Sequence, residues 1–253
     1  MNSVLSAGGP RIADAFTGNQ LLSTLDTEAR DALAVGATVV GMSVGDTVLR
    51  PGERVLRSLF PFGRTMISLV VDAGDQRSVE VASIGREGAV GGIVSCGDIP
   101  AFSRAEVIVE GPALSVPMPL LEELKGRSGH LKNLFCRYAD FLLAQIMQGA
   151  ACNSFHPIDA RAARWLLTAD DRAGPQLDLT QEALARLLGA QRTTINAVIG
   201  QFERDGLVEI RRGSITIRDR GAVERRACHC YRAVERFFAA AIGKSGTGDS
   251  SAG

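Results

Sequence analysis

The polar side chains of residues 192–201 have the types and the spacing needed to read DNA bases. Arg192, Thr193 and Asn196 fall on one side of a predicted helix. The opposite side is an apolar stripe formed by Ile195, Val198, Ile199 and Phe202. Arginine and asparagine can each form paired hydrogen bonds with a base edge, and a helix that packs through one face can enter the major groove with the other. We therefore predict that Arg192 and Asn196 face bases, with Thr193 beside them.

A predicted helix precedes this one, and a predicted hairpin follows it. Thr180 is expected to cap the first helix and Gly189 to end it, three residues before Arg192. Two short alternating runs then surround Arg212-Gly213. This order is typical of a winged helix-turn-helix, and an ordinary helical hairpin with a solvated polar face is the alternative. The residues expected to face DNA phosphates are Thr180, Gln191, Arg211 and Arg212.

Residues 178–218 resemble the winged helix-turn-helix of the Crp–Fnr family of bacterial transcription regulators. In that family a motif like LTQEALARLLG precedes the recognition helix, and Arg192 matches the arginine that reads guanine. Thr193 replaces the family's usual glutamate, and Ala197 replaces a common arginine. The resemblance therefore implies the family's mode of DNA binding but a different DNA sequence.

The preceding part of the chain is predicted to be a β-domain, which gives an α+β fold. Short β-like runs separated by Gly and Pro turns indicate an antiparallel jelly roll within residues 19–118, opened by a helix at Asn19–Ala34 after a loose segment. The runs expected as strands are Thr38–Met42, Thr47–Leu49, Thr65–Val71, Ser78–Ile84 and Glu106–Val109. This part resembles the cyclic-nucleotide-binding-like sensor domain of the same family.

The resemblance implies an effector pocket around a glycine-rich bend. The residues expected to line this pocket are Gly85, Glu87, Gly91, Gly92, Ser103 and Arg104. In the family a Gly-Glu pair ends this segment and its glutamate binds the ribose, but Gly91 and Gly92 occupy those positions here. Ser103 and Arg104 are one residue out of step with the pair that meets the phosphate. We expect no control by cyclic AMP and no cofactor. A different small-molecule effector and the absence of any effector are equally open.

Residues 119–154 have helical spacing and are predicted to form a long helix that ends in a hinge. In the family the corresponding helix pairs with its twin in a homodimer, and packing on its own barrel is the alternative. The apolar stripe expected at the dimer interface includes Leu131, Leu134, Tyr138, Leu142 and Gln145. A two-fold dimer would read a palindromic site on double-stranded DNA, with half-sites about one turn, roughly 34 Å, apart. The resemblance also implies RNA polymerase as a partner.

The DNA-binding domain is expected at residues 155–242, after a hinge near His156-Pro157. Arg220–Ile242 is predicted to be one additional helix, and residues 243–253 have a disordered composition. Cys228-His229-Cys230 would lie within that helix, where residues two apart point about 200° from each other. We therefore expect no metal site there, and buried small side chains instead.

Composition and charge narrow the class of protein. The net charge of the 253 residues is zero, but acidic side chains prevail before residue 155 and basic ones after it, which supports DNA binding weakly. With no long apolar run and no secretory leader, a cytoplasmic protein without membrane contact is expected. The cysteines, expected to be reduced, are Cys96, Cys136, Cys152, Cys228 and Cys230. No catalytic motif appears, so no enzyme is predicted. The rival function is a small-molecule sensor whose winged domain docks a protein rather than DNA.

Overall fold

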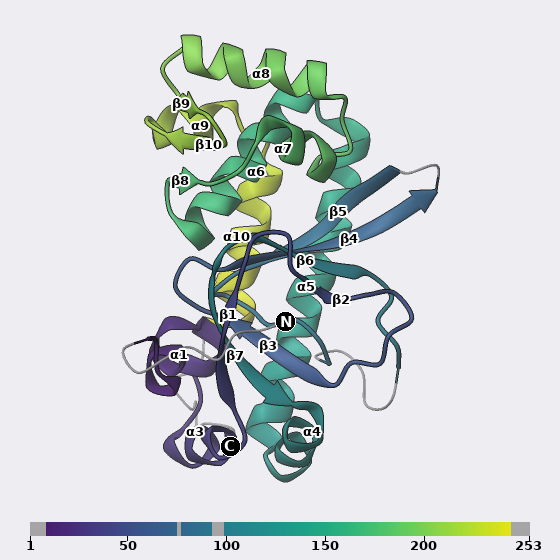
Figure 1. Cartoon of the computed structure of the whole chain (residues 1–253), viewed down its shortest axis with the longest axis vertical. Coiled ribbons are helices and arrows are strands. Elements are labelled where there is room, and N and C mark those ends of the chain that lie inside the picture. Colours follow the sequence, from purple (N-terminus) through teal and green to yellow (C-terminus); the bar gives the residue numbers. More distant parts are fainter. Residues whose placement is uncertain (1–8, 75–76, 93–98, 244–253) are drawn as a thin grey trace, which may run out of the picture.

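The computed structural model describes residues 9–74, 77–92 and 99–243, and it has the predicted α+β architecture. Short helices open the chain, two antiparallel sheets form a barrel, a long helix packs against it, and a small helical domain with a hairpin lies at the far end (Figure 1). Cys96 and the tail beyond residue 243 lie outside the described residues. Within the described part, no helix combines the length and the apolar character that a membrane span requires.

The barrel consists of two sheets with the strand orders β1-β7-β3 and β2-β6-β4-β5, and every pairing in them is antiparallel. All five predicted strands are present, three of them with shifted ends. The bounds are β1 Thr38–Met42, β2 Thr47–Leu49, β3 Arg57–Pro61, β4 Met66–Gly74, β5 Arg77–Ile84, β6 Arg104–Val109 and β7 Gly111–Pro117. Alternating side chains such as Val40, Met42 and Ile67 are buried and form one core of the domain.

Three short helices stand where a loose segment and a single helix were expected. They are α1 (Ile12–Gly18), α2 (Gln20–Ser23) and α3 (Thr27–Ala34). The chain is interrupted because Asn19 and Asp26 each accept backbone hydrogen bonds that begin a new helix. The buried Asn19 amide also donates to the carbonyl oxygens of Pro61 and Gly88, each at 2.8 Å. This side chain therefore fastens the N-terminal helices to the barrel.

The predicted long helix is α5 (Gly129–Phe155), which follows the shorter α4 (Met118–Arg127). Ser128 separates the two by capping α5. The Tyr138 hydroxyl accepts a hydrogen bond from the Ala89 amide at 3.0 Å and donates to the Ala89 carbonyl at 3.1 Å. Burial raises the pKa of Tyr138 well above its usual value. The helix is thus anchored to the barrel by a buried side chain.

The α5 residues expected at a dimer interface face the protomer's own barrel instead. Leu131, Leu134, Tyr138 and Gln145 each retain 7% exposure or less, and Leu142 packs against the barrel core. The first four therefore offer almost no surface to a partner. An apolar period in the sequence shows that one face of a helix is buried, but not which surface buries it. A different set of α5 residues is exposed, at alternating intervals of four and three: Cys136, Asp140, Leu143, Met147, Ala150 and Ser154.

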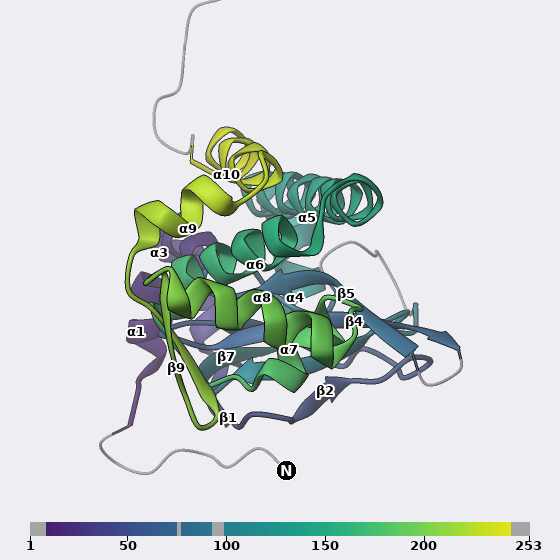
Figure 2. The same cartoon turned by 90° about the horizontal axis from the view of Figure 1, so that it is seen from above.

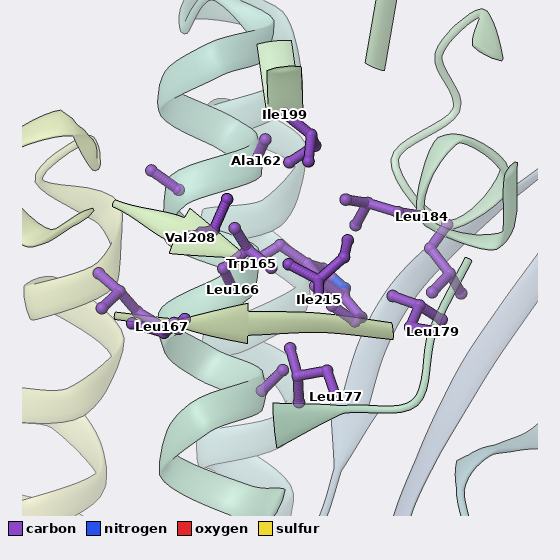
Figure 3. Close-up of a cluster of buried hydrophobic side chains, with 14 of the residues drawn as sticks. Ala162, Trp165, Leu166, Leu167, Leu177, Leu179, Leu184, Ile199, Val208 and Ile215 are labelled. Carbon is purple, nitrogen blue, oxygen red and sulfur yellow. The ribbon is translucent and has the colours of Figure 1, made fainter. Parts of the chain in front are cut away.

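Helix α5 ends and the next helix begins at His156-Pro157, because His156 has an extended backbone. The elements of the C-terminal domain are α6 Ile158–Ala173, β8 Gln176–Leu177, α7 Gln181–Leu187, α8 Arg192–Arg204, β9 Val208–Arg211 and β10 Ser214–Ile217. Trp165 and Leu166 of α6 lie at the centre of a core to which α7, α8 and the small sheet contribute (Figure 3).

The last part of the chain is two helices rather than one. α9 (Arg220–Arg226) ends at Ala227, whose backbone is extended, and α10 (Cys230–Ala241) starts afresh. α10 runs antiparallel beside α5, with the Phe141 and Phe238 rings 4.9 Å apart (Figure 2). Ile242 reaches the buried cluster that contains the N-terminal helices. Helix α10 therefore ties the C-terminal domain back to the barrel domain.

Candidate nucleic-acid interface

Helix α8 is the most outlying element of the C-terminal domain (Figure 1). Its apolar stripe is anchored in the core, where Ile195 and Ile199 have no exposed surface. Arg192, Thr193 and Asn196 are exposed on the other side. The structure therefore separates the packing face from the polar face as the sequence predicts.

The turn before α8 sets how the helix is presented. Gly189 has a φ of 61°, a conformation that favours glycine, and it ends α7 within a few residues of α8. The Thr180 hydroxyl accepts a hydrogen bond from the Ala183 amide at 3.1 Å and caps α7 as expected. Gln191 is the N-cap residue of α8, but its side chain makes no capping hydrogen bond. The Gln191 amide therefore has hydrogen-bonding capacity left for a partner outside the helix.

A groove of about 270 Å³ lies between α7, α8 and the β9–β10 hairpin. Four of the predicted DNA-contacting residues line it: Thr180, Arg192, Asn196 and Arg211. Gln191, Thr193 and Arg212 lie outside this lining and are exposed. Residues from three separate elements are thus gathered around one polar concavity, which is a property of the folded domain and not of any single helix.

Arg192 makes an ion pair across the groove, with its Nη1 atom 3.3 Å from Oε2 of Glu182. Both side chains are more than half exposed, so the pair is weak and can be broken at little cost. Glu182 was not among the residues predicted to contact DNA. Its position in the first turn of α7 was visible in the sequence, but its distance from Arg192 depends on the angle between the two helices.

Arg211 and Arg212 of the hairpin differ in their ion pairing. Arg211 lies 2.7 Å from the Glu209 carboxylate, which also pairs with Arg218. Hydrogen bonds from Arg218 and Arg211 to the Glu209 carboxylate lower its pKa. Arg212, by contrast, forms no ion pair with any residue in the described part of the chain. Its charge is therefore available to an anionic partner without competition from a carboxylate.

The sensor barrel contains a second concavity, of about 420 Å³, which is in the range of small-molecule pockets. Three predicted effector residues line it: Gly91, Gly92 and Ser103. The rest of the described lining is apolar, with Leu69, Ile84, Phe102 and Leu142 among its residues, and no charged side chain belongs to it. A cavity of this kind suits an apolar ligand better than a phosphate.

The other predicted effector residues lie elsewhere. Arg104 on β6 faces carboxylates, at 3.7 Å from Asp72 and 3.6 Å from Glu106. Glu87 is buried and pairs with Arg172 of α6, and Gly85 donates its amide to the Glu87 carboxylate. Glu87 and Gly85 therefore belong to the contact between the two domains, and Arg104 is already neutralised.

Comparison with known proteins identifies the domain that carries the groove. Residues 160–226 match the Crp-like helix-turn-helix domain, which includes α7, α8 and the hairpin. Residues 160–226 therefore belong to the Crp-like helix-turn-helix family, and a longer stretch of the chain is similar to a CRP-like regulator. Crp–Fnr proteins are transcription regulators rather than enzymes.

Two Crp–Fnr relatives from Mycobacterium tuberculosis match parts of the chain. One is the HTH-type transcriptional regulator Cmr, 38% identical over 71 residues, which are 28% of this chain and 28% of the relative. The other is a CRP-like cAMP-activated global transcriptional regulator, 29% identical over 136 residues, which are 51% of this chain and 61% of the relative. The chain therefore matches less than two thirds of either relative's length.

Two solved structures share the fold of most of the chain. FixK2 from Bradyrhizobium japonicum superimposes with a TM-score of 0.65 at 16% identity, over 76% of this chain and 98% of that one. A Crp/Fnr-family protein from Eubacterium rectale gives a TM-score of 0.62 at 18% identity, over 81% and 96% of the two chains. At these identities the likeness extends to the fold alone.

Proposed function

We propose that the protein is a homodimeric regulator that binds specific double-stranded DNA through α8 and the hairpin. The observation that carries the proposal is the shared groove, where Arg192 and Asn196 of the recognition helix converge with Arg211 of the hairpin. In this proposal Arg192 and Asn196 hydrogen-bond with base edges, and the exposed Arg212 contacts the phosphates. Both relatives from Mycobacterium tuberculosis are named as transcriptional regulators, which supports the same activity.

The dimer contact is proposed on the exposed face of α5. Leu143 and Met147 are 55% and 63% exposed, and they belong to the set that recurs at intervals of four and three. That spacing places side chains along the seam of two paired helices. A dimer built on this seam would present two recognition helices to a palindromic site.

A small apolar molecule is proposed as the effector, if the regulator has one. One relative is named as cAMP-activated, but the described wall of this chain's cavity offers no cation for a cyclic phosphate, and Arg104 is held by Asp72 and Glu106. Control by cyclic AMP is therefore not part of the proposal. A ligand would act by favouring one of two arrangements of the DNA-binding domains.

The test is selection of bound duplexes from a random pool, using purified full-length protein with and without cyclic AMP. We expect a palindrome with half-sites about one turn apart, and no change in sequence or yield when cyclic AMP is added. Selection of a single half-site would contradict the dimer, and enrichment only with cyclic AMP would contradict the proposed pocket chemistry.

The rival proposal, a winged domain that docks a protein, predicts a different response to salt. DNA binding releases counterions, so affinity should fall steeply as salt rises. No enrichment from the pool at low salt, with or without extract from the native cell, would favour the protein-docking alternative.

A further inference from the structure

Four side chains that can bind metal meet at the junction of α5, α9 and α10. Cys152 and His156 come from the end of α5, one turn apart on the same face. Cys228 and Cys230 come from the break between α9 and α10. One donor atom from each residue lies within 4.8 Å of the other three.

The spacing of these atoms matches a single tetrahedral ion. The Sγ atoms of Cys152 and Cys228 are 3.5 Å apart, and Cys230 Sγ is 3.5 Å from Nδ1 of His156. A tetrahedral ion with bonds of about 2.3 Å to sulfur and about 2.0 Å to nitrogen holds neighbouring ligand atoms roughly 3.5 to 3.8 Å apart. An iron–sulfur cluster would need wider spacing between some of the four ligands, because they would be shared among more than one iron atom.

The helix break is what allows both C-terminal cysteines to point to the same place. In one continuous helix Cys228 and Cys230 would diverge, which was the reason for expecting no metal site. Ala227 instead has φ −70° and ψ 146°, and Cys230 is the first residue of α10. The two cysteines can therefore face the same ion in this fold.

The surroundings suit thiolate ligands. Cys152 and Cys230 are fully buried, so a bound ion would be closed to solvent on that side. Nε2 of Gln148 donates a hydrogen bond to Cys230 Sγ at 3.0 Å, as outer residues do around metal-bound sulfur. Arg161 and Arg164 lie close enough to Cys152 for their charges to act on it. Three thiolates exceed the charge of a divalent ion, and these guanidinium groups offset the remainder.

We propose that Cys152, His156, Cys228 and Cys230 bind one structural Zn²⁺ ion. Three sulfur ligands and one imidazole form a complete tetrahedral set of the kind that structural zinc sites use. The ion would join the last turn of α5, beside the hinge at Pro157, to the start of α10. It would therefore fix the position of the DNA-binding domain on the long helix, independently of whether that domain binds DNA.

The test uses full-length protein purified under reducing conditions. Elemental analysis should find about one zinc ion per protomer, and X-ray absorption at the zinc edge should report three sulfur neighbours and one nitrogen. Cobalt loaded into the stripped protein should give the intense near-ultraviolet absorption of thiolate-bound Co²⁺ and the visible bands of a tetrahedral ion.

Variants locate the site. Cys228→Ser and Cys230→Ser should each reduce the thiolate–cobalt absorption and weaken metal binding, and His156→Ala should weaken zinc binding at least about 10-fold. Cys136→Ser is the matched control, because Cys136 is an exposed free cysteine of α5 outside the group. Circular dichroism verifies that each variant is folded. The zinc-edge spectrum of the wild type reports the ligands directly, so it tests the proposal even if a variant does not fold.

Three results would overturn the proposal. One is reduced wild-type protein that takes up neither zinc nor cobalt, or whose bound zinc has only oxygen and nitrogen neighbours. A second is equal loss of metal from Cys136→Ser and Cys228→Ser. The third is a Cys152–Cys228 disulfide that persists in protein purified with reductant, because that bond would occupy two of the four ligands.

Discussion

Nε of Arg172 lies 2.8 Å from Oε1 of Glu87, and the two side chains are only 5% and 10% exposed. Arg172 belongs to the first helix of the DNA-binding domain, whereas Glu87 follows β5 of the sensor barrel. The Glu87 carboxylate also accepts the Gly85 amide, and Arg172 donates to the Ser83 hydroxyl. Glu87 and Gly85, which were expected to line an effector pocket, thus contact the other domain instead.

Removing one partner of this buried pair should be strongly destabilising. Arg172→Met leaves the Glu87 carboxylate buried without a counter-charge, and we expect it to lower the free energy of unfolding by about 3–5 kcal/mol. The double variant Glu87→Gln with Arg172→Met removes both charges and should recover most of that loss. Urea denaturation of the two variants and the wild type measures both effects. Equal losses in the single and the double variant would show that the uncompensated charge is not the cause.

Glu80 should make stability depend on pH. It retains some exposure, but its carboxylate is shielded where it accepts hydrogen bonds from Ser68 and from Nε1 of Trp165, the latter at 2.8 Å. Burial raises the pKa of Glu80 above 4.5, although those hydrogen bonds oppose the shift. The folded state then holds the proton more tightly than the unfolded state. Glu80 therefore lowers the stability of the folded state as the pH rises above about 4.5.

Glu80→Gln tests this directly, because the amide keeps the shape and stays neutral. The melting temperature of the variant should exceed that of the wild type at pH 7, and the difference should shrink towards pH 4.5. Glu110→Gln, at an exposed glutamate, serves as the control and should leave the pH profile unchanged. A variant less stable than the wild type at pH 7 would mean that the carboxylate stays charged and stabilising.

Arg192 and Arg212 should contribute differently to DNA binding. Arg192→Ala is expected to relax the preference for one base pair by about 10- to 100-fold, since a paired arginine–guanine contact discriminates by about 1–3 kcal/mol. Arg212→Ala should weaken all sequences evenly and reduce the slope of log affinity against log salt by about 1.

Fluorescence anisotropy with a selected duplex and a scrambled one, at several salt concentrations, separates the two effects. Arg127→Ala is a suitable control, because Arg127 is an exposed arginine on α4 of the sensor domain. If both groove variants lost affinity equally on both duplexes, the proposed division between base and phosphate contacts would be incorrect.

Two charges on the exposed face of α5 should dissociate the proposed dimer. Burying a leucine or methionine contributes about 1.5–3 kcal/mol, and each residue occurs twice across a two-fold interface. Leu143→Glu with Met147→Glu should therefore raise the dimer dissociation constant at least about 100-fold, as measured by analytical ultracentrifugation. Val35→Glu changes an exposed apolar residue of the N-terminal segment and should leave the dimer intact. A monomeric wild type, or a dimer that survives the double change, would rule out this interface.

The sequence was sufficient to predict elements whose signals are local. The period of α8 and the glycine at 189 predicted a recognition helix and its turn, and the alternating strands of the barrel predicted the fold class. These features depend on neighbours a few residues away. They can therefore be predicted without knowing how the domains pack.

The errors concern contacts between distant parts of the chain. Tyr138 has the spacing of an interface residue, yet it packs on its own barrel because no local signal states which surface covers a helix. Glu87 resembles a polar turn residue until α6 brings Arg172 to it. The break at Ala227 carries neither glycine nor proline, so nothing in the sequence separated Cys228 from the helix that follows.

The position of Ile242 also bears on how the protein folds as it is made. This residue is buried in the cluster that contains Leu33 and Leu131, so the core beneath the first helices is completed by nearly the last described residue. While the ribosome is still adding α10, that core has an open side at Phe141, whose ring later packs on Phe238. The core of the domain that is synthesised first therefore cannot be completed until α10 has been made.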